Sequence, residues 1–403
     1  MSAYDQPGGQ STRTHDYSRE LVSRGHEVTF FTNGFCHFKH TERLGAEERW
    51  RVEVVDGIRV VWLKTRPYKG NGAGRGLNML DNVLRIFQAS KVLGDKPDVL
   101  LGPSVPTLTG WVAARLAERY RVPFVFEVRD VWPDALVDIG GLSKSSPTYH
   151  VFRYLEKMLY RKAERISSTL PHLSDHVAAS GSDPAKIVCI PNGVDLAPYT
   201  RDVAYDGGEG RQLVVMYVGG FGLDHDVPTI IRAAKLLQDV NDTTFRFVVI
   251  GGGVRKVEVE ELVQSYQLRN LELREPIPKS SIPEAQRAAD ILVAAITDSK
   301  SYRFGLNLNK LCAYFASARP VLFSGNPPND PVQDAGAGLS VPAEDPAAMV
   351  AGLNELAVRG AAVRIEMGER GRRYAETTLS MEALGARMED MLASAIEEYK
   401  ARS

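Results

Sequence analysis

Hydrophobic positions along this chain follow two alternating patterns. Short apolar runs of the kind found in buried strands occur at 26–32 (HEVTFFT), 98–102, 123–130, 213–219 and 245–253. Segments with apolar residues at helical spacing lie between such runs, at 15–25, 106–121, 227–240 and 255–268. Strands that alternate with amphipathic helices predict parallel sheets covered by helices on both faces.

A polar stretch rich in glycine and proline, residues 195–212, separates two such alternating halves. At roughly 100–200 residues per domain, 403 residues also favour two domains. We expect an α/β protein with two doubly wound, Rossmann-like domains at 1–196 and 197–379. An amphipathic helix within 380–403 could pack on either domain, including back on the first. Because such sheets bind ligands at the carboxyl ends of their strands, two facing domains would form a cleft.

Composition narrows the class of protein. A net charge of −1 argues against nucleic-acid binding, and three widely spaced cysteines suggest a reducing, cytoplasmic compartment. No apolar run approaches the length of a membrane-spanning helix, and the polar N-terminus is not a signal peptide. Only a few residues precede the first glycine-rich turn, so the first strand is either absent or lies upstream of Met1.

Two glycine-rich turns precede predicted helices. Gly8 and Gly9 lie just before the first helix, and the turn in VIGGGVRK is followed by Arg255 and Lys256 in the first turn of the next. Glycine permits close approach of a ligand, and a helix N-terminus supplies free N–H groups for an anion. A plain turn is the alternative for both, and neither fits a dinucleotide-binding or P-loop pattern.

Lys310 stands at the start of a predicted helix. The stretch RFGLNLNKLCAYFASARPVLFSG reads as a loop, a helix and a buried strand, with Asn307 and Asn309 as plausible caps. A lysine is unfavourable at a helix N-terminus unless an anion is bound there. The alternative is an exposed lysine on a capped helix.

Three charged residues end a buried strand in VPFVFEVRDVWPD. Glu127, Arg129 and Asp130 occupy the carboxyl end, where an α/β sheet meets its ligand. The alternative is a salt bridge among these same residues.

Segment 149–166 combines apolar residues at helical spacing with an excess of basic residues. A basic amphipathic helix can bind an anionic membrane surface, although such a stripe more often packs in a core. Metal sites are not expected. The pair Asp224 and Asp226 is better explained by capping or solvation, and Cys36 with its neighbouring histidines has no second ligand cluster.

The order of these motifs resembles the family-4 retaining glycosyltransferases of the GT-B fold. The likeness covers nearly the whole chain and is carried by RELVSRGHEVTFFT, PFVFEVRDVWP, KIVCIPNGVD, FRFVVIGGG, NKLCAYFASARPVL and AGAGLSVPAEDP. Segment 34–80 looks like a bacterial subgroup that builds surface polysaccharides and includes N-acetylfucosaminyl transferases. The resemblance implies a UDP-sugar donor, no cofactor or metal, retention at the anomeric carbon, and a lipid-diphosphate-linked saccharide acceptor at the inner membrane face.

The resemblance also implies roles for particular residues. Gly252 and Gly253 would pass close to the donor, Ile277 would contact the base through its backbone, and Lys310 with the N–H groups around Asn309 would hold the diphosphate. Gly8 and Gly9 would lie near the phosphates or the acceptor, and Arg129 and Asp130 on the acceptor side.

The sequence departs from the family at three places. Gly305 and Ala313 replace two glutamates, and no basic pair follows the first strand of the second domain, where Gly220 and Leu223 stand. The phosphate charge would therefore fall on Lys310, helped by Arg303, Arg255 or Lys256.

We expect front-face attack, in which the acceptor hydroxyl gives its proton to the departing phosphate oxygen and no dedicated base is needed. Two alternatives remain open: a sugar-nucleotide epimerase of the same fold, and a non-catalytic nucleotide-binding scaffold in the same pathway.

Overall fold

The computed structural model describes residues 13–36, 40–70, 72–94, 96–138, 141–201 and 204–402. The chain forms two compact units, unit 1 from residues 1–191 and 384–403 and unit 2 from residues 192–383. The sequence interpretation set the boundaries at 196/197 and 379/380. Gly8 and Gly9 lie outside the described residues.

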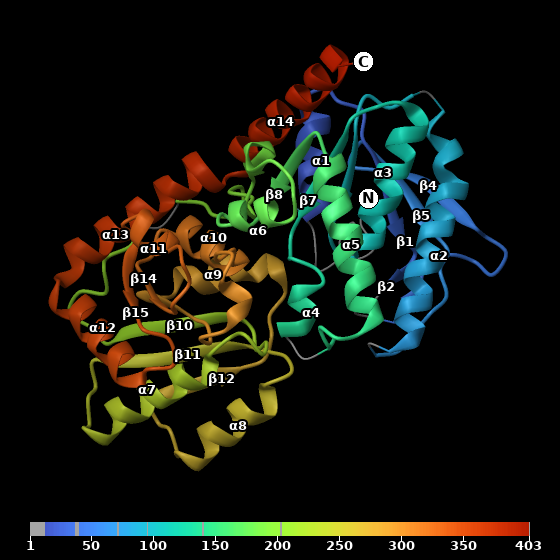
Figure 1. Cartoon of the computed structure of the whole chain (residues 1–403). Coiled ribbons are helices and arrows are strands. Elements are labelled where there is room, and N and C mark those ends of the chain that lie inside the picture. The colour runs from blue at the N-terminus through green and yellow to red at the C-terminus, as the bar shows by residue number, and fades with distance from the viewer. Residues whose placement is uncertain are drawn as a thin grey trace. The chain divides into compact units, whose positions relative to one another are not determined.

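Unit 1 contains parallel strands covered by helices (Figure 1). One sheet has the order β1-β5-β4, with β4 antiparallel, and the other has the parallel order β6-β7-β8-β9. Its main strands are β1 (Thr29–Asn33), β4 (Trp50–Val55), β5 (Ile58–Leu63), β6 (Leu100–Pro103), β7 (Phe124–Val128), β8 (Arg165–Ser168) and β9 (Ile187–Cys189), and β2 (Phe35–Cys36) pairs with β3 (Thr41–Glu42). Its helices are α1 (Arg13–Ser23), α2 (Ala73–Ala89), α3 (Thr107–Tyr120), α4 (Asp134–Asp138), α5 (Pro147–Lys162) and α6 (Ser174–Ala179).

The C-terminal helix α14 (Met381–Arg402) belongs to unit 1 from Leu384 onward. Arg165 of β8 forms an ion pair with Glu398, and Arg24 pairs with Glu389 at 3.2 Å. These contacts attach the helix to the first unit by polar groups along its length.

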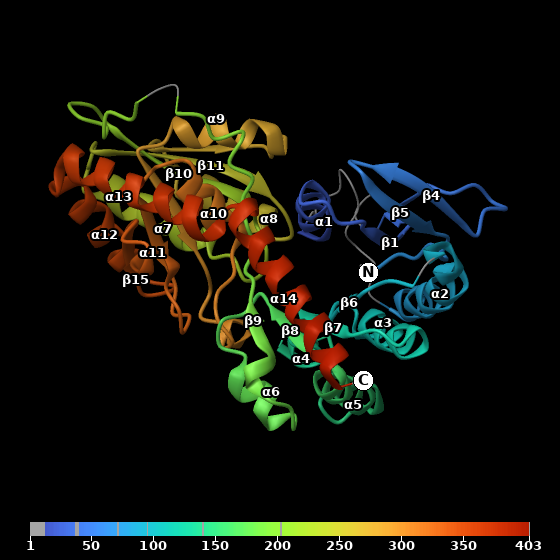
Figure 2. The same ribbon diagram turned by 90° about the horizontal axis from the view of Figure 1, so that it is seen from above.

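Unit 2 is built on one six-stranded parallel sheet of order β12-β11-β10-β13-β14-β15. Figure 2 shows β10, β11 and β15 of this sheet. The strands are β10 (Leu213–Gly220), β11 (Phe245–Gly252), β12 (Leu271–Arg274), β13 (Ile291–Ala295), β14 (Val321–Ser324) and β15 (Gly338–Val341). The helices are α7 (Val227–Asp239), α8 (Lys256–Ser265), α9 (Ile282–Arg287), α10 (Asn309–Ala316), α11 (Pro331–Asp334), α12 (Pro346–Val358) and α13 (Gly360–Tyr374). Strand β10 lies inside the sheet between β11 and β13, so its carboxyl end is central.

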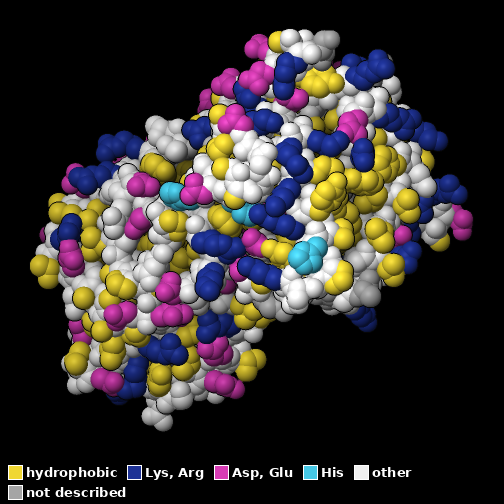
Figure 3. Space-filling model, in the orientation of Figure 1, with side chains coloured by type: hydrophobic (Ala, Val, Ile, Leu, Met, Phe, Trp, Pro, Cys, Tyr) yellow, Lys and Arg dark blue, Asp and Glu magenta, His cyan; other side chains and the backbone are white. Residues whose placement is uncertain are grey.

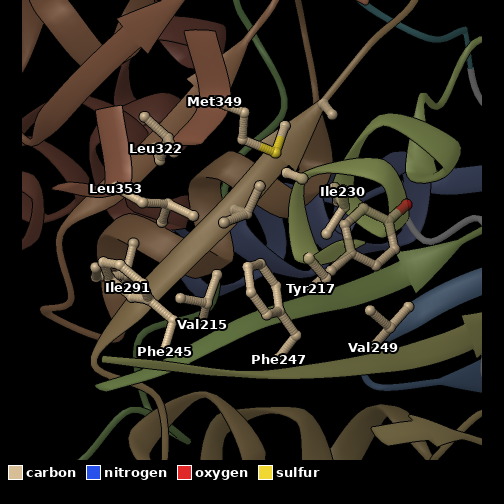
Figure 4. Close-up of a cluster of buried hydrophobic side chains, with 14 of the residues drawn as sticks. Val215, Tyr217, Ile230, Phe245, Phe247, Val249, Ile291, Leu322, Met349 and Leu353 are labelled. Atoms are coloured by element: carbon tan, nitrogen blue, oxygen red, sulfur yellow. The ribbon is translucent and has the colours of Figure 1, made fainter. Parts of the chain in front are cut away.

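Side chains from the sheet and its covering helices form the core of unit 2 (Figure 4). Val215, Phe247 and Ile291 come from three strands and Leu353 from α12, and all are almost completely buried. This explains why the strands read as continuous apolar runs, since both faces of the sheet are covered.

Helix α5 ends earlier than the sequence suggested. The segment 149–166 was treated as one helix, but α5 stops at Lys162, and Ala163 adopts an extended conformation. Arg165 and Ile166 belong to β8. Ile166 continues the helical spacing in the sequence, but in the structure it lies in strand β8, where its side chain is fully buried.

Within the part of the chain that the structure describes, no helix is long and apolar enough to cross a bilayer.

Candidate functional site

The carboxyl ends of β10 and β11 bring glycines together in unit 2. The two strands pair in parallel, with Gly219 beside Gly251 and Gly220 beside Gly252. A Cβ at Gly251 would collide with the carbonyl oxygen of Gly219, and one at Gly253 would lie 2.8 Å from the carbonyl oxygen of Phe221. Side chains are therefore excluded from this edge, which leaves the backbone accessible to a ligand.

Lys310 reaches this glycine edge from the second position of α10. Its Nζ donates a 2.5 Å hydrogen bond to the Tyr217 hydroxyl and lies 4.1 Å from the centre of that ring. A Cβ at Gly219 would sit only 3.2 Å from the Lys310 Nζ, so glycine is needed to admit the ammonium. The predicted position of Lys310 in the first helical turn is confirmed.

The charge of the Lys310 ammonium is not balanced by the part of the chain that the structure describes. No carboxylate among the described residues forms an ion pair with it, and burial lowers its pKa to about 7. Taking a cation out of water without a partner is unfavourable, so proteins keep such groups where a ligand supplies the opposite charge.

The start of α10 adds free backbone donors. Leu308 occupies the N-cap position and makes no side-chain capping bond. The expectation that Asn307 and Asn309 cap the helix is wrong. Asn309 is the first helical residue, and the Asn307 Oδ1 instead accepts a 3.0 Å hydrogen bond from the backbone N–H of Asn192. The Leu311 N–H donates to the Leu308 carbonyl oxygen at 3.1 Å, so the N–H groups of Asn309 and Lys310, the first two helical residues, are the ones placed to bind an anion.

Tyr217 and His225 complete the surroundings of Lys310, and the sequence interpretation missed both. The Tyr217 hydroxyl donates to the carbonyl oxygen of Gly220 at 2.7 Å and accepts from Lys310. Nδ1 of His225 donates to the same carbonyl oxygen at 2.7 Å. Burial, and then the charge of Lys310, lower the pKa of His225 to about 4, which keeps the imidazole neutral at pH 7.

Tyr217 connects the core of unit 2 to this site. Its ring packs among the buried side chains, while its hydroxyl oxygen lies at the outer end of the ring (Figure 4). Burial raises its pKa well above the ordinary value. The hydroxyl therefore stays protonated, donates to Gly220 and has only lone pairs to offer Lys310.

The other predicted phosphate cations already have partners. Arg255 makes two hydrogen bonds to Glu258, at 2.7 and 2.8 Å, and Lys256 binds Glu275 at 2.6 Å. Arg303 is exposed and stacks over the Phe304 ring at 4.5 Å. Lys310 differs from Arg255 and Lys256 because no carboxylate among the described residues forms an ion pair with it.

Ile277 follows β12 and is half-buried against the apolar cluster that includes Met216 and Val218. The structure describes Gly305 as buried and Ala313 as half-buried on α10. Asp226 caps α7 by accepting from the Thr229 N–H, as the capping alternative predicted. The described residues contain no group of three His, Cys, Asp or Glu side chains placed to share a metal ion.

The charged residues at the end of β7 form a buried network in unit 1. Glu127 is 3% exposed, and its two carboxylate oxygens bind Arg13 at 3.0 Å and Arg129 at 2.7 Å. Burial alone would raise the pKa of Glu127, but Arg129 and Arg13 hold it below the ordinary value. The salt bridge that the sequence offered as an alternative is present.

Arg13 was not identified from the sequence. Its guanidinium also donates to the carbonyl oxygens of Ile190 and Pro191, at 2.7 and 2.8 Å, so it ties α1 to the segment after β9. Arg129 reaches the Thr14 hydroxyl, and Asp130 is exposed beside it. Glu127 thus orients two arginines, and of the three predicted residues Asp130 is exposed, Arg129 is half-buried and Glu127 is buried.

If the site holds a nucleoside diphosphate, as the sequence resemblance implies, Tyr217→Phe should weaken UDP binding by about three- to tenfold, because the ammonium loses the acceptor that orients it, a loss on the order of 1 kcal/mol. Isothermal titration with UDP measures the change. Tyr314→Phe is a matched control, since that hydroxyl donates to the carbonyl oxygen of Val293 at 3.2 Å and does not contact Lys310. Equal UDP affinities for wild type and Tyr217→Phe would exclude this role for the hydroxyl.

Both halves of the chain match glycosyltransferase domains. Residues 8–193 match the model of the Glycosyl transferase 4-like domain, and residues 212–358 match Glycosyl transferases group 1. The glycine edge, Tyr217, Lys310 and the start of α10 lie within the second match.

Named relatives share similarity over most of the chain. D-inositol 3-phosphate glycosyltransferase of Kineococcus radiotolerans is 26% identical over 394 residues, covering 92% of this chain and 86% of the relative. The putative colanic acid biosynthesis glycosyl transferase WcaI of Escherichia coli is 20% identical over 273 residues, covering 62% and 64%.

Solved structures show the same fold. Sucrose-phosphate synthase from Thermosynechococcus elongatus superimposes with a TM-score of 0.72 at 17% identity, covering 100% of this chain and 96% of that one. HepE of Anabaena, in complex with UDP and glucose, gives 0.68 at 13% identity, covering 98% of each chain. These likenesses establish two Rossmann-like domains of the GT-B type.

Proposed function

We propose that this chain, a glycosyltransferase of the GT-B fold, moves a sugar from a UDP-linked donor to a lipid-diphosphate-linked saccharide in the assembly of a bacterial surface polysaccharide. The single observation that carries the proposal is the Lys310 ammonium, which stands without a carboxylate among the described residues at the start of α10. A diphosphate supplies the missing negative charge.

The donor site would be formed within unit 2. Gly252 and Gly253 would let the donor approach the backbone, Ile277 would contact the base, and the N–H groups around Asn309 would bind phosphate oxygens with Lys310. Arg255, Lys256 and Arg303 would act at longer range. That HepE was solved with UDP and with UDP-glucose supports a UDP donor on this fold.

The transfer step would retain the configuration at the anomeric carbon. The bond between C1 of the sugar and the β-phosphate oxygen breaks, and its electron pair stays on the phosphate. The acceptor hydroxyl oxygen attacks C1 from the same face and gives its proton to that phosphate oxygen. Lys310 and the α10 N–H groups stabilise the charge that develops on the leaving group.

Arg129 and Asp130 would orient the acceptor from unit 1, with Glu127 fixing Arg129 through its 2.7 Å ion pair. A lipid-linked acceptor places the protein at the inner face of the cytoplasmic membrane. Helix α5 would contribute to that contact, because Val151 and Tyr154 are exposed on it and basic residues end it. The name of the WcaI relative supports polysaccharide assembly, and transfer of an N-acetylated amino sugar such as N-acetylfucosamine is the finer proposal.

The relatives favour one further acceptor class. Two of them are D-inositol 3-phosphate glycosyltransferases, from Kineococcus radiotolerans and Xylanimonas cellulosilytica. A phosphorylated cyclitol is therefore the second candidate acceptor.

A donor screen against both acceptor classes tests these proposals. Purified protein is incubated with UDP-sugars and either lipid-diphosphate-linked saccharides or inositol 3-phosphate, and products are identified by mass spectrometry. We expect one glycolipid product, whose anomeric configuration by NMR matches that of the donor. UDP binding without any product would favour the scaffold, and conversion of the UDP-sugar without acceptor would favour the epimerase.

A further inference from the structure

Helix α2 of unit 1 presents three leucines to solvent. Leu77, Leu80 and Leu84 are 44%, 51% and 58% exposed. Spacings of three and four residues place them on one side of the helix. We call these three side chains the leucine face. Single exposed apolar residues are ordinary, but three in line on one helix indicate a surface that is covered in use.

The opposite side of α2 is fixed in the unit, so the leucines cannot simply turn inward. Met79 and Ile86 are buried in the core. The buried Asn78 donates to the Thr65 hydroxyl at 2.9 Å and to the carbonyl oxygen of Arg66 at 2.7 Å. The orientation of the helix is thus set by apolar and polar contacts together.

The surroundings of the leucine face are strongly basic. Segment 64–96 contains seven Lys and Arg residues against two aspartates, in a chain whose net charge is −1. Lys69 precedes α2 in the chain and Lys91 follows it, and both are exposed. Asp81, the aspartate on α2, is engaged by the Arg66 guanidinium at 2.7 Å. An apolar helix face with exposed lysines near the two ends of the helix is typical of segments that lie on anionic membranes.

The neighbouring helix α3 adds an aromatic side chain of the kind found at bilayer surfaces. Figures 1 and 2 show α2 and α3 side by side, and the Phe87 and Trp111 rings meet edge to face at 6.1 Å. The Arg115 guanidinium lies 5.7 Å from the centre of the Trp111 ring. Tryptophan with an adjacent arginine suits the boundary between lipid and water.

The apolar surface continues on the same helical layer. Figure 3 shows hydrophobic side chains gathered over the part of unit 1 that Figure 1 labels α3 and α5, with Lys and Arg side chains around them. Val151 and Tyr154 on α5 are more than half exposed. Helices α2, α3 and α5 therefore present apolar and basic groups together.

We propose that the leucine face is the principal membrane-binding element of this chain and inserts into the headgroup region of an anionic bilayer, with Lys69 and Lys91 contacting lipid phosphates. The positive charge around the leucine face distinguishes between two partners that could cover it, a second copy of the chain and an anionic bilayer. A second copy of the chain on a two-fold axis would set two strongly basic segments against each other, whereas an anionic bilayer complements them. The membrane proposal rests on the proposed function in one respect only: membrane binding would give the protein access to a membrane-bound acceptor.

Vesicle flotation of the full chain tests the proposal. We expect wild type to float with vesicles of phosphatidylcholine and phosphatidylglycerol, and to float less without the anionic lipid or at high salt. The triple variant L77Q/L80Q/L84Q should bind at least about tenfold more weakly, since it loses its inserted apolar area. Replacing Lys69 and Lys91 by glutamine should weaken binding about fivefold per lysine.

Two control variants isolate the leucine face. The variant L77M/L80M/L84M keeps the face apolar and should float like wild type. The variant L236Q/V240Q/V358Q removes exposed apolar side chains from unit 2 instead and should also float like wild type. Circular dichroism melts should show all variants folded, because the replaced side chains are already exposed.

Three results would overturn the proposal: wild type that does not float, a glutamine triple variant that floats equally well, or a wild-type dimer in light scattering that this variant dissolves. UDP titration without vesicles keeps the two proposals apart. The glutamine triple variant should bind UDP like wild type, and a protein that binds vesicles but not UDP would contradict the proposed transfer reaction while leaving the membrane proposal intact.

Discussion

Replacement of Lys310 by methionine is expected to lower sugar transfer by about 100- to 1000-fold, the usual cost of removing one preorganised group that stabilises a leaving charge. The same change should make the ligand-free protein more stable at pH 7, by on the order of 1 kcal/mol, because it removes a buried ammonium that has no carboxylate among the described residues. Rates with saturating acceptor and urea denaturation measure the two effects.

The direction in which stability changes with pH distinguishes removal of a buried cation from a general improvement in packing. The pKa of Lys310 falls from 10.5 to about 7 on folding, so the unfolded chain binds more protons between these values. Wild-type stability should therefore rise with pH across that window, and the advantage of Lys310→Met should shrink. Lys235→Met is the control, because Lys235 is paired with Asp239 on α7. A variant that loses transfer but gains no stability would contradict the buried-cation account.

Glu127→Gln should produce the largest loss of stability, about 3–5 kcal/mol in the free energy of unfolding. The substitution leaves Arg13 and Arg129 without the buried carboxylate that both now bind. Urea denaturation at pH 7 measures the loss. Glu118→Gln, which breaks exposed ion pairs with Arg115 and Lys162, should cost less than about 1 kcal/mol.

Wild-type stability again rises with pH in this second effect, but here wild type and variant converge at low pH instead of high pH. Because the two arginines hold the Glu127 pKa below 4.5, the contribution of this carboxylate is present above the unfolded pKa and disappears as the pH falls through the folded one. Wild type and Glu127→Gln should therefore approach each other in stability below about pH 4.5. Equal urea midpoints at pH 7 would show that the network is not a source of stability.

Much of the architecture could be predicted from the sequence because the strands are buried on both faces. Runs such as 245–253 are continuously apolar, and their spacing from amphipathic segments identifies alternating strands and helices. The end of α5 could not be predicted in the same way. The apolar periodicity runs on through Ile166, and only the extended backbone at Ala163 shows that a strand has taken over.

Residues of the candidate site could be predicted from the sequence only where a residue type was unfavourable for its position. Lys310 conflicts with the helix dipole, and that conflict pointed to an anion. Tyr217 gives no such signal, because it lies in an apolar run and its ring is indeed core. Its hydroxyl becomes part of the site through a partner 93 positions away. Arg13 is similar, since its role depends on Glu127, which is 114 positions away. Contacts of this kind follow from the fold and not from local pattern.

Calorimetric titration of wild type with UDP at pH 7.0 and 8.5 tests the central claim most directly. If Lys310 holds the diphosphate, binding raises its pKa from about 7, so UDP binding should take up protons and weaken severalfold or more at the higher pH. Lys310→Met should bind far more weakly and show no lysine-linked uptake. UDP affinity that is the same at both pH values and is unchanged in Lys310→Met would contradict the account.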